Sequence, residues 1–477
     1  MCLISISRSV TLSNQNVYAC LVCGKYFQGR GRSTHAYTHS VQHSHHVFIH
    51  LETSKIYCLP DNYEVVDSSL DDIKRALFPS YAPRDMAALD RNTTLARDQY
   101  GVAYLPGFVG LNNLTSTDYL NVTLHALAHV APLRDFFLDP TNYAGCKSPL
   151  VLAFGEVIRR LWSHDNFKSA VSPHEFLQAV SIASNKRFHV GQQAECIDFM
   201  SWLLNSLHVG LGGSKKKKAG TSIIHKTFQG LVHVHTMTRE AAAAGAAGGA
   251  REEWESSGED VPFLHLRLDI PRTPLFKDSQ GGNIIPQVSL FTVLSKFDGQ
   301  TYTDAVRAGQ LSRKRYTLRR LPPYLIFHLA RFTKNNFFVE KNPTIVNFPV
   351  KNLELKDYVG SKSVKELKAV LNAHGVAHAD VVERAELEAR VRDVLGASLS
   401  KYDLCANICH DSPPGQGKEG QMDPLQGGSY RVHVQNRASE QWYEIQDLHV
   451  QETMPQLIGL SESYIMIFRR KDLPAGQ

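Results

Sequence analysis

Two cysteines separated by two residues, followed by a run of histidines, constrain the start of this chain more than any other feature. Cys20 and Cys23 form a C-x-x-C pair, and the histidines that follow are His35, His39, His43, His45 and His46. Zinc prefers four tetrahedral thiolate and imidazole ligands, and a C-x-x-C turn presents both sulfurs to one ion. No βαβ pattern surrounds the pair, as a redox motif of this spacing would require. We therefore expect a zinc module built on two cysteines and two histidines.

The other cysteines and the bulk composition indicate a globular protein of the reducing compartments. Eight cysteines are present among 477 residues; four lie within the first 58 residues and the other four are scattered over the rest. A disulfide framework would be denser and the chain shorter. No apolar run reaches the roughly 18 residues that span a bilayer, and the first residues lack the pattern of a secretory signal. We expect a location in the cytoplasm or nucleus and no membrane partner.

Two local basic runs say more about possible partners than the net charge of the chain does. The net charge of +6 is modest for this length and does not by itself indicate nucleic acid. Two basic runs, Lys215–Lys218 and Ser312–Arg320, are stronger signals. Such runs are most often solvated surface, but they are also suited to RNA, to another acidic partner or to nuclear import.

The order of the predicted elements indicates an α+β protein. Residues 1–66 form the Cys/His module, residues 67–103 a polar helical connector, and residues 104–472 a larger unit. Apolar residues recur at helical spacing after residue 118, over residues 149–162 and over residues 194–208. After about residue 228, alternating strand patterns dominate. A low-complexity stretch at 239–260 and a pair of amphipathic helices at 361–397 are predicted insertions. The second weakly resembles a SAP-type module, some of which bind DNA.

The segment CLVCGKYFQGRGRSTHAYTHSVQHSHHVF resembles the UBP-type zinc finger, which in many deubiquitinating systems binds the free C-terminus of ubiquitin. The resemblance implies that one zinc ion is held by Cys20, Cys23, His39 and His45. Cys2, His35 and Cys58 match parts of the family's further metal sites, but those sets are incomplete in this sequence. Because Cys2 lies at the start of the chain, we expect ligands upstream of it, and so a gene start placed too late.

Residues 105–470 resemble the ubiquitin-specific proteases, which are papain-like cysteine proteases. The family's Cys box reads like GLxNLGNTCYMNS, whereas this chain has GLNNLTSTDYLN over residues 110–121. Asp118 therefore occupies the nucleophile position, and Ser116 the position of an asparagine that stabilises the oxyanion. In the second box, Ser429 takes the place of the general base. Gln446 takes the place of the orienting acid and is followed directly by Asp447.

These replacements predict a protein without protease activity. Cysteine catalysis needs a thiolate, a base and a group that orients the base, and loss of such a triad costs about 10⁶-fold in kcat in a serine protease. A carboxylate at a helix N-terminus is instead a favourable capping charge. The alternatives are a rewired site that uses Cys196, Cys405, Cys409 or His410, and a hydrolase that uses Asp118 with Asp447. No second C-x-x-C pair follows Cys23, unlike in many active relatives.

The combination of a UBP-type finger with a protease domain that lacks its nucleophile resembles a splicing-associated, inactive branch of this family. The resemblance implies a scaffold in pre-mRNA splicing that is located in the nucleus. The implied partners are tri-snRNP and other spliceosomal proteins, with ubiquitin or a ubiquitin-like protein as a further partner. Two rival hypotheses remain: a ubiquitin-binding adaptor outside splicing, and an active deubiquitinase with a rewired site.

Overall fold

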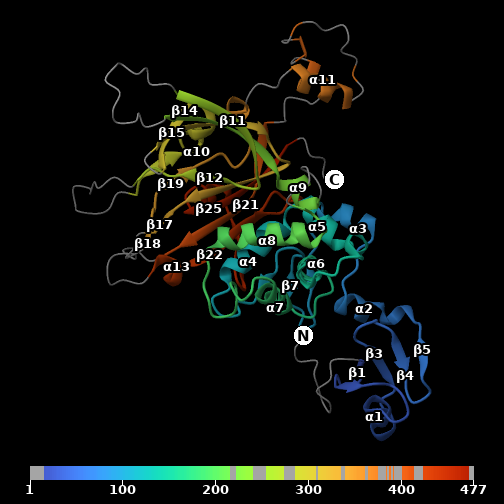
Figure 1. Cartoon of the computed structure of the whole chain (residues 1–477). Coiled ribbons are helices and arrows are strands. Elements are labelled where there is room, and N and C mark those ends of the chain that lie inside the picture. The colour runs from blue at the N-terminus through green and yellow to red at the C-terminus, as the bar shows by residue number, and fades with distance from the viewer. Residues whose placement is uncertain are drawn as a thin grey trace, which may run out of the picture.

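The computed structural model describes residues 16–214, 222–239, 254–272, 285–307, 310–334, 339–359, 364–373, 400–412 and 423–471, and positions 376, 383, 386–387 and 390–391. Figure 1 shows a small N-terminal unit, here called the finger, at one end of a larger main domain. Helices come first in the main domain and mostly antiparallel sheets follow, which confirms the predicted α+β class. No helix among the described residues has the length and apolar character needed to cross a bilayer.

The finger is a five-stranded sheet in the order β2-β1-β3-β4-β5 with one helix. Its elements are β1 Val17–Cys20, β2 Tyr26–Gln28, α1 His35–His43, β3 Val47–His50, β4 Ile56–Cys58 and β5 Tyr63–Val65. Its apolar core is small, and Phe48, Ala36 and Leu59 are its fully buried members. Sheets this small bury too little apolar surface to be stable alone, and a metal commonly supplies the remainder.

The connector begins with the 3₁₀ turn η2 Ser68–Leu70 and continues with α2 Asp71–Leu77 and α3 Pro83–Leu89. Ile73 and Leu77 of α2 pack against the finger's sheet. At the other end, Asp90 follows α3 and accepts a hydrogen bond from the buried Arg134 guanidinium at 2.8 Å. A cavity of about 760 Å³ lies between the finger's sheet, α2 and the main domain. The connector therefore contacts both units.

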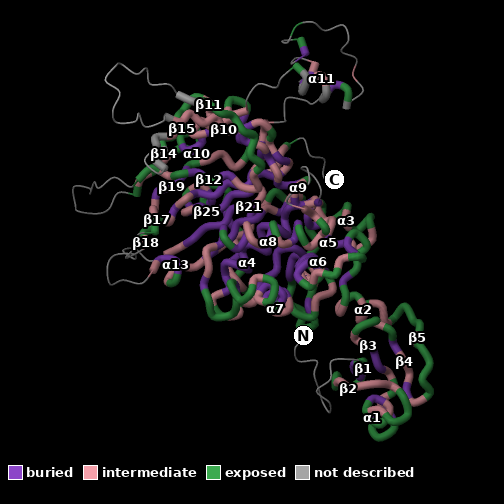
Figure 2. Tube along the Cα trace, in the orientation of Figure 1, coloured by how far each residue is buried: buried purple, intermediate pink, exposed green. Residues whose placement is uncertain are grey.

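The helical half of the main domain surrounds one completely buried helix, α4 Asp118–Ala128. The neighbouring helices are α5 Ala131–Leu138, α6 Pro149–Leu161, α7 His174–Ala183, α8 Cys196–Gly210 and α9 Ile223–Phe228. The short strands here are β6 Ala96–Arg97, β7 Ala103–Tyr104, β8 Gly110–Leu111 and β9 Ala170–Val171, and η3 Pro140–Tyr143 is a 3₁₀ turn. α4 is buried on all sides although it carries Asp118, Asn121, Thr123 and His125, and Figure 2 shows the buried residues concentrated around α4 and α8.

The sheet half has a large sheet in the order β12-β16-β25-β21-β22-β23-β24, with β20 paired to β21. Its strands are β12 Leu266–Asp269, β16 Tyr324–Ala330, β20 Leu353–Glu354, β21 Lys401–Asp411, β22 Ser429–Gln435, β23 Trp442–Gln446, β24 His449–Thr453 and β25 Ser463–Arg470. α4 packs against β22 and β21. This contact places the start of α4 beside the start of β22.

A second sheet, here called the distal sheet, has the order β11-β10-β15-β14. Its strands are β10 Gly230–Arg239, β11 Trp254–Phe263, β14 Asp298–Arg307 and β15 Gln310–Arg320. The remaining elements are β13 Gln287–Ser289, α10 Leu290–Leu294, η4 Ser295–Phe297, β17 Phe332–Lys334, β18 Val339–Lys341, β19 Ile345–Asn347, η5 Lys356–Tyr358, α11 Val364–Ala373, α13 Pro424–Gly427 and α14 Pro455–Ile458.

The two stretches predicted as insertions are only partly described. Residues 240–253 lie outside the described residues, and β11 begins at Trp254, so strand covers the end of the range where we expected a loop. In the second stretch, α11 confirms one of the two expected helices. Leu367 and Leu371 of α11 form a separate small cluster with Leu387 and Val391. This cluster shares no residue with the cores of the main domain.

Candidate functional sites

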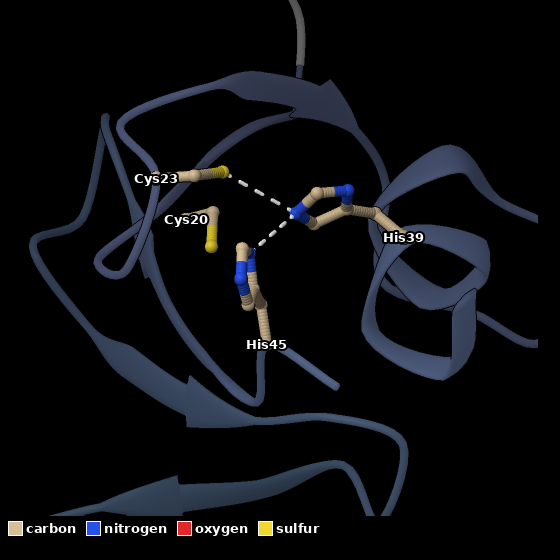
Figure 3. Close-up of side chains that lie close together, drawn as sticks. All are labelled: Cys20, Cys23, His39 and His45. Atoms are coloured by element: carbon tan, nitrogen blue, oxygen red, sulfur yellow. Dashed lines mark hydrogen bonds between the residues drawn. The ribbon is translucent and has the colours of Figure 1, made fainter. Parts of the chain in front are cut away.

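The first site is a Cys/His cluster in the finger (Figure 3). Ligand atoms of Cys20, Cys23, His39 and His45 all lie within 4.8 Å of one another. Cys23 Sγ is 3.4 Å from His39 Nε2, which is 3.1 Å from His45 Nδ1. Four ligands at zinc bond lengths of about 2.0–2.3 Å on a tetrahedron lie roughly 3.3–3.8 Å apart. The donor set and its spacing therefore fit one zinc ion.

Local structure explains how four distant donors converge. Cys20 ends β1, and Gly24 adopts a left-handed backbone with φ of 70°, which turns the chain so that Cys23 returns toward Cys20. His39 points inward from α1, while His45 follows the left-handed Ser44 that ends this helix. Burial lowers the pKa of His39, and the neighbouring histidines lower it further. A neutral imidazole is the form that binds a metal.

The other residues matched to metal sites lie apart from this cluster. His35 is exposed at the first position of α1, and Cys58 is half-buried in β4. Neither belongs to a described group of three or more potential ligands. Cys2 lies outside the described residues. Cys20, Cys23, His39 and His45 are thus the set that the fold brings together.

The second site is the start of α4, where Asp118 is the first helical residue and only 4% exposed. Its Oδ1 accepts a hydrogen bond from Gln193 Nε2, and its Oδ2 accepts one from the Tyr430 backbone N–H, both at 2.8 Å. Burial raises the pKa of Asp118, while these two hydrogen bonds oppose the rise. Both oxygens are therefore engaged by the protein, and the carboxylate joins α4 to the start of β22.

The other residues predicted to line the reaction centre lie in two separate hydrogen-bonded groups. Gln446 Nε2 donates to Ser429 Oγ at 3.2 Å. Asp447 accepts hydrogen bonds from Asn113 Nδ2 at 3.0 Å and Asn121 Nδ2 at 2.7 Å. No titratable base occupies the Ser429 position, since a hydroxyl bonded to an amide cannot take up a proton near neutral pH. Asp118 and Asp447 are each held by neutral amide donors.

Ser116 lies in a turn whose backbone conformation the sequence did not reveal. Thr115 has φ of 73° and Ser116 has φ of 53°, which is the left-handed region. A β-branched residue is rare there because its Cβ crowds the backbone. In the family's box a glycine stands at the Thr115 position, so the turn keeps its shape while the residue that favours it is absent.

Of the cysteines considered as alternative nucleophiles, Cys196 and Cys409 are buried in the main domain and Cys405 is partly buried. Cys196 is fully buried beside Thr123 Oγ1 at 3.2 Å, and burial raises the pKa of its thiol to about 12. Cys405 lies 3.3 Å from the His129 carbonyl, and burial raises the pKa of its thiol to about 11. His410 is fully buried, and burial lowers its pKa to about 3.

Cys409 has a more reactive environment that sequence reasoning missed. Its Sγ is 3.7 Å from His433 Nδ1, and His433 Nε2 lies 2.9 Å from Glu444 Oε2. Burial lowers the pKa of His433, but the neighbouring Cys409 sulfur and Glu444 raise it to about 9 overall. Cys409 is 0% and His433 1% exposed, so this arrangement cannot reach a protein substrate. The alternation of SYRVHVQ against WYEIQ was the signal that could have paired His433 with Glu444.

The finger also contains an anchored arginine that no sequence motif singled out. The Arg30 guanidinium lies 3.9 Å from the centre of the Tyr57 ring and donates to Asn62 Oδ1 at 2.7 Å. Arg30 is half-buried. A guanidinium fixed in this way suits a planar carboxylate ligand.

The fold and these sites define the class of protein: it has a UBP-type zinc finger followed by a papain-like domain. Residues 109–468 match the family described as ubiquitin carboxyl-terminal hydrolase, and residues 7–70 match the zinc finger described as occurring in ubiquitin hydrolases and other proteins. The chain therefore belongs to the ubiquitin carboxyl-terminal hydrolase family, and it is a ubiquitin-specific-protease-like protein with an N-terminal UBP-type zinc finger.

Individual relatives match over nearly the whole chain. Mouse ubiquitin carboxyl-terminal hydrolase 39 is 46% identical, with 97% of this chain and 77% of the relative covered. The probable mRNA-splicing protein ubp10 of Schizosaccharomyces pombe is 39% identical, with 97% and 84% covered. The pre-mRNA-splicing factor SAD1 of Saccharomyces cerevisiae is 26% identical, with 97% and 89% covered.

Solved structures agree with the fold. The crystal structure of an essential yeast splicing factor has a TM-score of 0.67 at 25% identity and covers 97% of this chain and 94% of its own. The SAGA DUB module bound to ubiquitin aldehyde has a TM-score of 0.52 at 16% identity, covering 99% and 91%, and shows the fold alone.

Proposed function

We propose that this protein is a non-catalytic scaffold of pre-mRNA splicing, located in the nucleus and associated with the tri-snRNP. The splicing role is supported by relatives named as splicing proteins that match 97% of this chain. The absence of catalysis is supported chiefly by one observation, that the residue at the nucleophile position is a buried carboxylate with both oxygens hydrogen-bonded.

None of the three groups that the protease reaction requires is supplied by the residue at its position. Asp118 is a poor nucleophile toward an isopeptide, because a carboxylate is weakly nucleophilic and each oxygen of this one already accepts a hydrogen bond, from Gln193 or from Tyr430. Ser429 cannot serve as the base, and Gln446 donates to it rather than orienting an imidazole. The hydrolase that uses Asp118 with Asp447 lacks support, since among the described residues only the finger gathers a potential metal-binding group.

We propose Cys20, Cys23, His39 and His45 as the zinc ligands of the finger. Zinc bound there would supply structure rather than catalysis, since four protein donors leave no open coordination position. Ubiquitin binding through the finger is the second candidate function, and Arg30 held between Tyr57 and Asn62 favours it, since this arrangement suits a C-terminal carboxylate.

The test is reaction of the zinc-loaded protein with a ubiquitin C-terminal electrophile, followed by mass spectrometry. We expect no adduct on the natural chain and an adduct on an Asp118→Cys, Ser429→His, Gln446→Asp variant, whose cleft would again hold a nucleophile and a base. An adduct on Cys196, Cys405 or Cys409 of the natural chain would overturn the proposal in favour of a rewired enzyme.

A purification from nuclear extract separates the scaffold from the adaptor. Recovery of tri-snRNP proteins with the natural chain supports the splicing scaffold. Recovery of ubiquitin chains without snRNP proteins would instead support the adaptor outside splicing. An Arg30→Ala variant should lose ubiquitin binding if the finger provides it, while an Arg187→Ala variant, which removes an exposed arginine of the main domain, should retain it.

A further inference from the structure

Among the described residues, the main core packs against only one face of the distal sheet. On β15, Leu318 is buried and Tyr316 packs against the Phe297 ring at 6.0 Å between centroids, so the even-numbered residues face the core. Val232 of β10 is opposite Leu318 and belongs to the same core. Successive side chains of a strand point to opposite faces, and the odd-numbered residues of β15 therefore face outward.

Basic residues are concentrated on β15. The strand carries Arg313, Lys314, Arg315, Arg319 and Arg320 and no acidic residue. Arg313 and Arg315 belong to the outward set, whereas the register with β10 shifts at Arg319, whose Nε is buried. Arg313 is paired with Asp304 at 3.1 Å, near the open end of the sheet. Arg315 has no carboxylate partner among the described residues, so its charge is available to a ligand.

An aromatic row crosses the same face at Arg315. This residue lies directly opposite His235 of β10 on one side and Tyr302 of β14 on the other. The Arg315 guanidinium lies 5.5 Å from the centre of the Tyr302 ring, and Tyr302 is 44% exposed. In the row His235–Arg315–Tyr302 the cation thus lies between two aromatic residues, of which Tyr302 is exposed and His235 is half-buried with its Nδ1 enclosed.

We propose that the outward face of the distal sheet, centred on the row His235–Arg315–Tyr302, binds single-stranded RNA. Arginine on an open sheet contacts phosphates, and exposed aromatic rings stack on unpaired bases. An acidic protein segment would use the cation but not the exposed Tyr302 ring, whereas an unpaired base would use both. The exposed Tyr302 ring beside Arg315 offers a base a stacking surface that a patch of charge alone lacks.

The inference deepens the proposed splicing scaffold by naming one of its partners. The inference rests on the proposed function for its biological setting and on this surface for its chemistry. If the protein did not bind RNA, the recovery of tri-snRNP proteins would still be expected. Conversely, RNA binding by the purified protein would persist even if no snRNP protein were recovered.

The test uses the full zinc-loaded chain and a fluorescein-labelled, mixed-sequence 20-nucleotide single-stranded RNA, followed by anisotropy at several salt concentrations. We expect Arg315→Glu to weaken binding about tenfold and to make the slope of log K against log salt shallower by about 0.7 for each phosphate that the protein no longer neutralises. Tyr302→Ala should weaken binding about fivefold, because one base would have no ring to stack on.

Two controls give the result its meaning. Arg187→Glu makes the same charge change at an exposed arginine on the helical side of the main domain and should leave RNA binding unchanged, and Arg315→Lys should retain most of it. Absence of RNA binding by the natural chain, or equal weakening by Arg187→Glu, would overturn the proposal. Binding of a poly-glutamate peptide as tight as that of RNA, and equally abolished in Arg315→Glu, would overturn it in favour of an acidic protein partner.

Discussion

The finger cluster and the start of α4 are both made by chain segments that are far apart in sequence, yet they contain opposite chemistry. In the finger, two thiols and two imidazoles converge within 4.8 Å. At α4, a carboxylate, a hydroxyl and amides are bonded to one another and to backbone groups. The thiols and imidazoles of the finger need a cation between them to use their lone pairs, whereas the polar groups at the start of α4 already have hydrogen-bond partners within the protein. The same kind of convergence thus gives a metal site in one place and a structural polar contact in the other.

The largest expected effect is on the finger. Cys23→Ser should abolish stoichiometric zinc and unfold the finger, because structural zinc contributes about 10–16 kcal/mol in zinc-finger peptides and the finger's own core is small. Metal content by elemental analysis and hydrogen exchange over residues 17–65 measure the two losses. Tryptophan fluorescence should be unchanged, because no tryptophan precedes Trp162.

The control for this change is Cys58→Ser. Cys58 lies in the same sheet but outside the four-residue cluster, so the variant should keep its zinc. Loss of metal in Cys58→Ser would show that the finger holds a ligand set other than the one proposed.

The second-largest expected effect is a loss of stability of the main domain as the pH falls. Burial lowers the pKa values of His125 and His410 to about 3 and those of His129 and His328 to about 4. A depressed histidine pKa means that stability is present above the unfolded value of about 6.5 and is lost as pH falls toward the folded value. Between pH 7.5 and 5.5 each histidine should cost about 1.4 kcal/mol, and the four together about 5–6 kcal/mol.

Urea unfolding followed by tryptophan fluorescence at the two pH values measures this loss. His410→Phe should remove about 1.4 kcal/mol of the difference, because neither ring nitrogen of His410 has a hydrogen-bond partner among the described residues and a phenyl ring fits the same space. An exposed control, His164→Phe, should leave the pH dependence unchanged. An unchanged slope in His410→Phe would mean that this histidine does not titrate with unfolding.

The third effect tests whether Asp118 is a structural contact. Asp118→Ala leaves the Gln193 amide and the Tyr430 N–H without an acceptor, and each buried unsatisfied donor costs about 1–3 kcal/mol. We expect a loss of about 2–4 kcal/mol in the free energy of unfolding. Asp198→Ala removes an exposed ion pair with Arg187 and should cost less than about 1 kcal/mol. Equal effects of the two variants would contradict the role given to Asp118.

The smallest expected effect is an increase in stability. Thr115→Gly should raise the free energy of unfolding by about 0.5–1 kcal/mol, because the relief of the left-handed strain at φ of 73° outweighs the greater unfolded-state entropy of glycine. Thermal unfolding is sufficient to detect it. A destabilised Thr115→Gly variant would indicate that the threonine side chain makes a contact worth more than the backbone strain.

The sequence was informative where a pattern has one physical meaning. The C-x-x-C spacing and the histidines predicted a zinc module, and the resemblance to the UBP-type finger implied the four residues that the fold brings together. Helical periodicity predicted α6 and α8, whose observed bounds are Pro149–Leu161 and Cys196–Gly210. The absence of a thiol at residue 118 and of an imidazole at residue 429 could also be read directly, since chemistry that requires a side chain fails without it.

Only the tertiary structure decided what the replaced residues do. That Asp118 accepts from Gln193 and from the backbone of Tyr430 depends on α4 packing against β22, across more than 300 positions of sequence. The enclosure of Cys409 with His433 and the open row at Arg315 depend in the same way on strand register. Side-chain type determines which reactions are possible, and it is fixed residue by residue. Burial and hydrogen-bond partners are properties of the packed chain, because segments distant in sequence supply them.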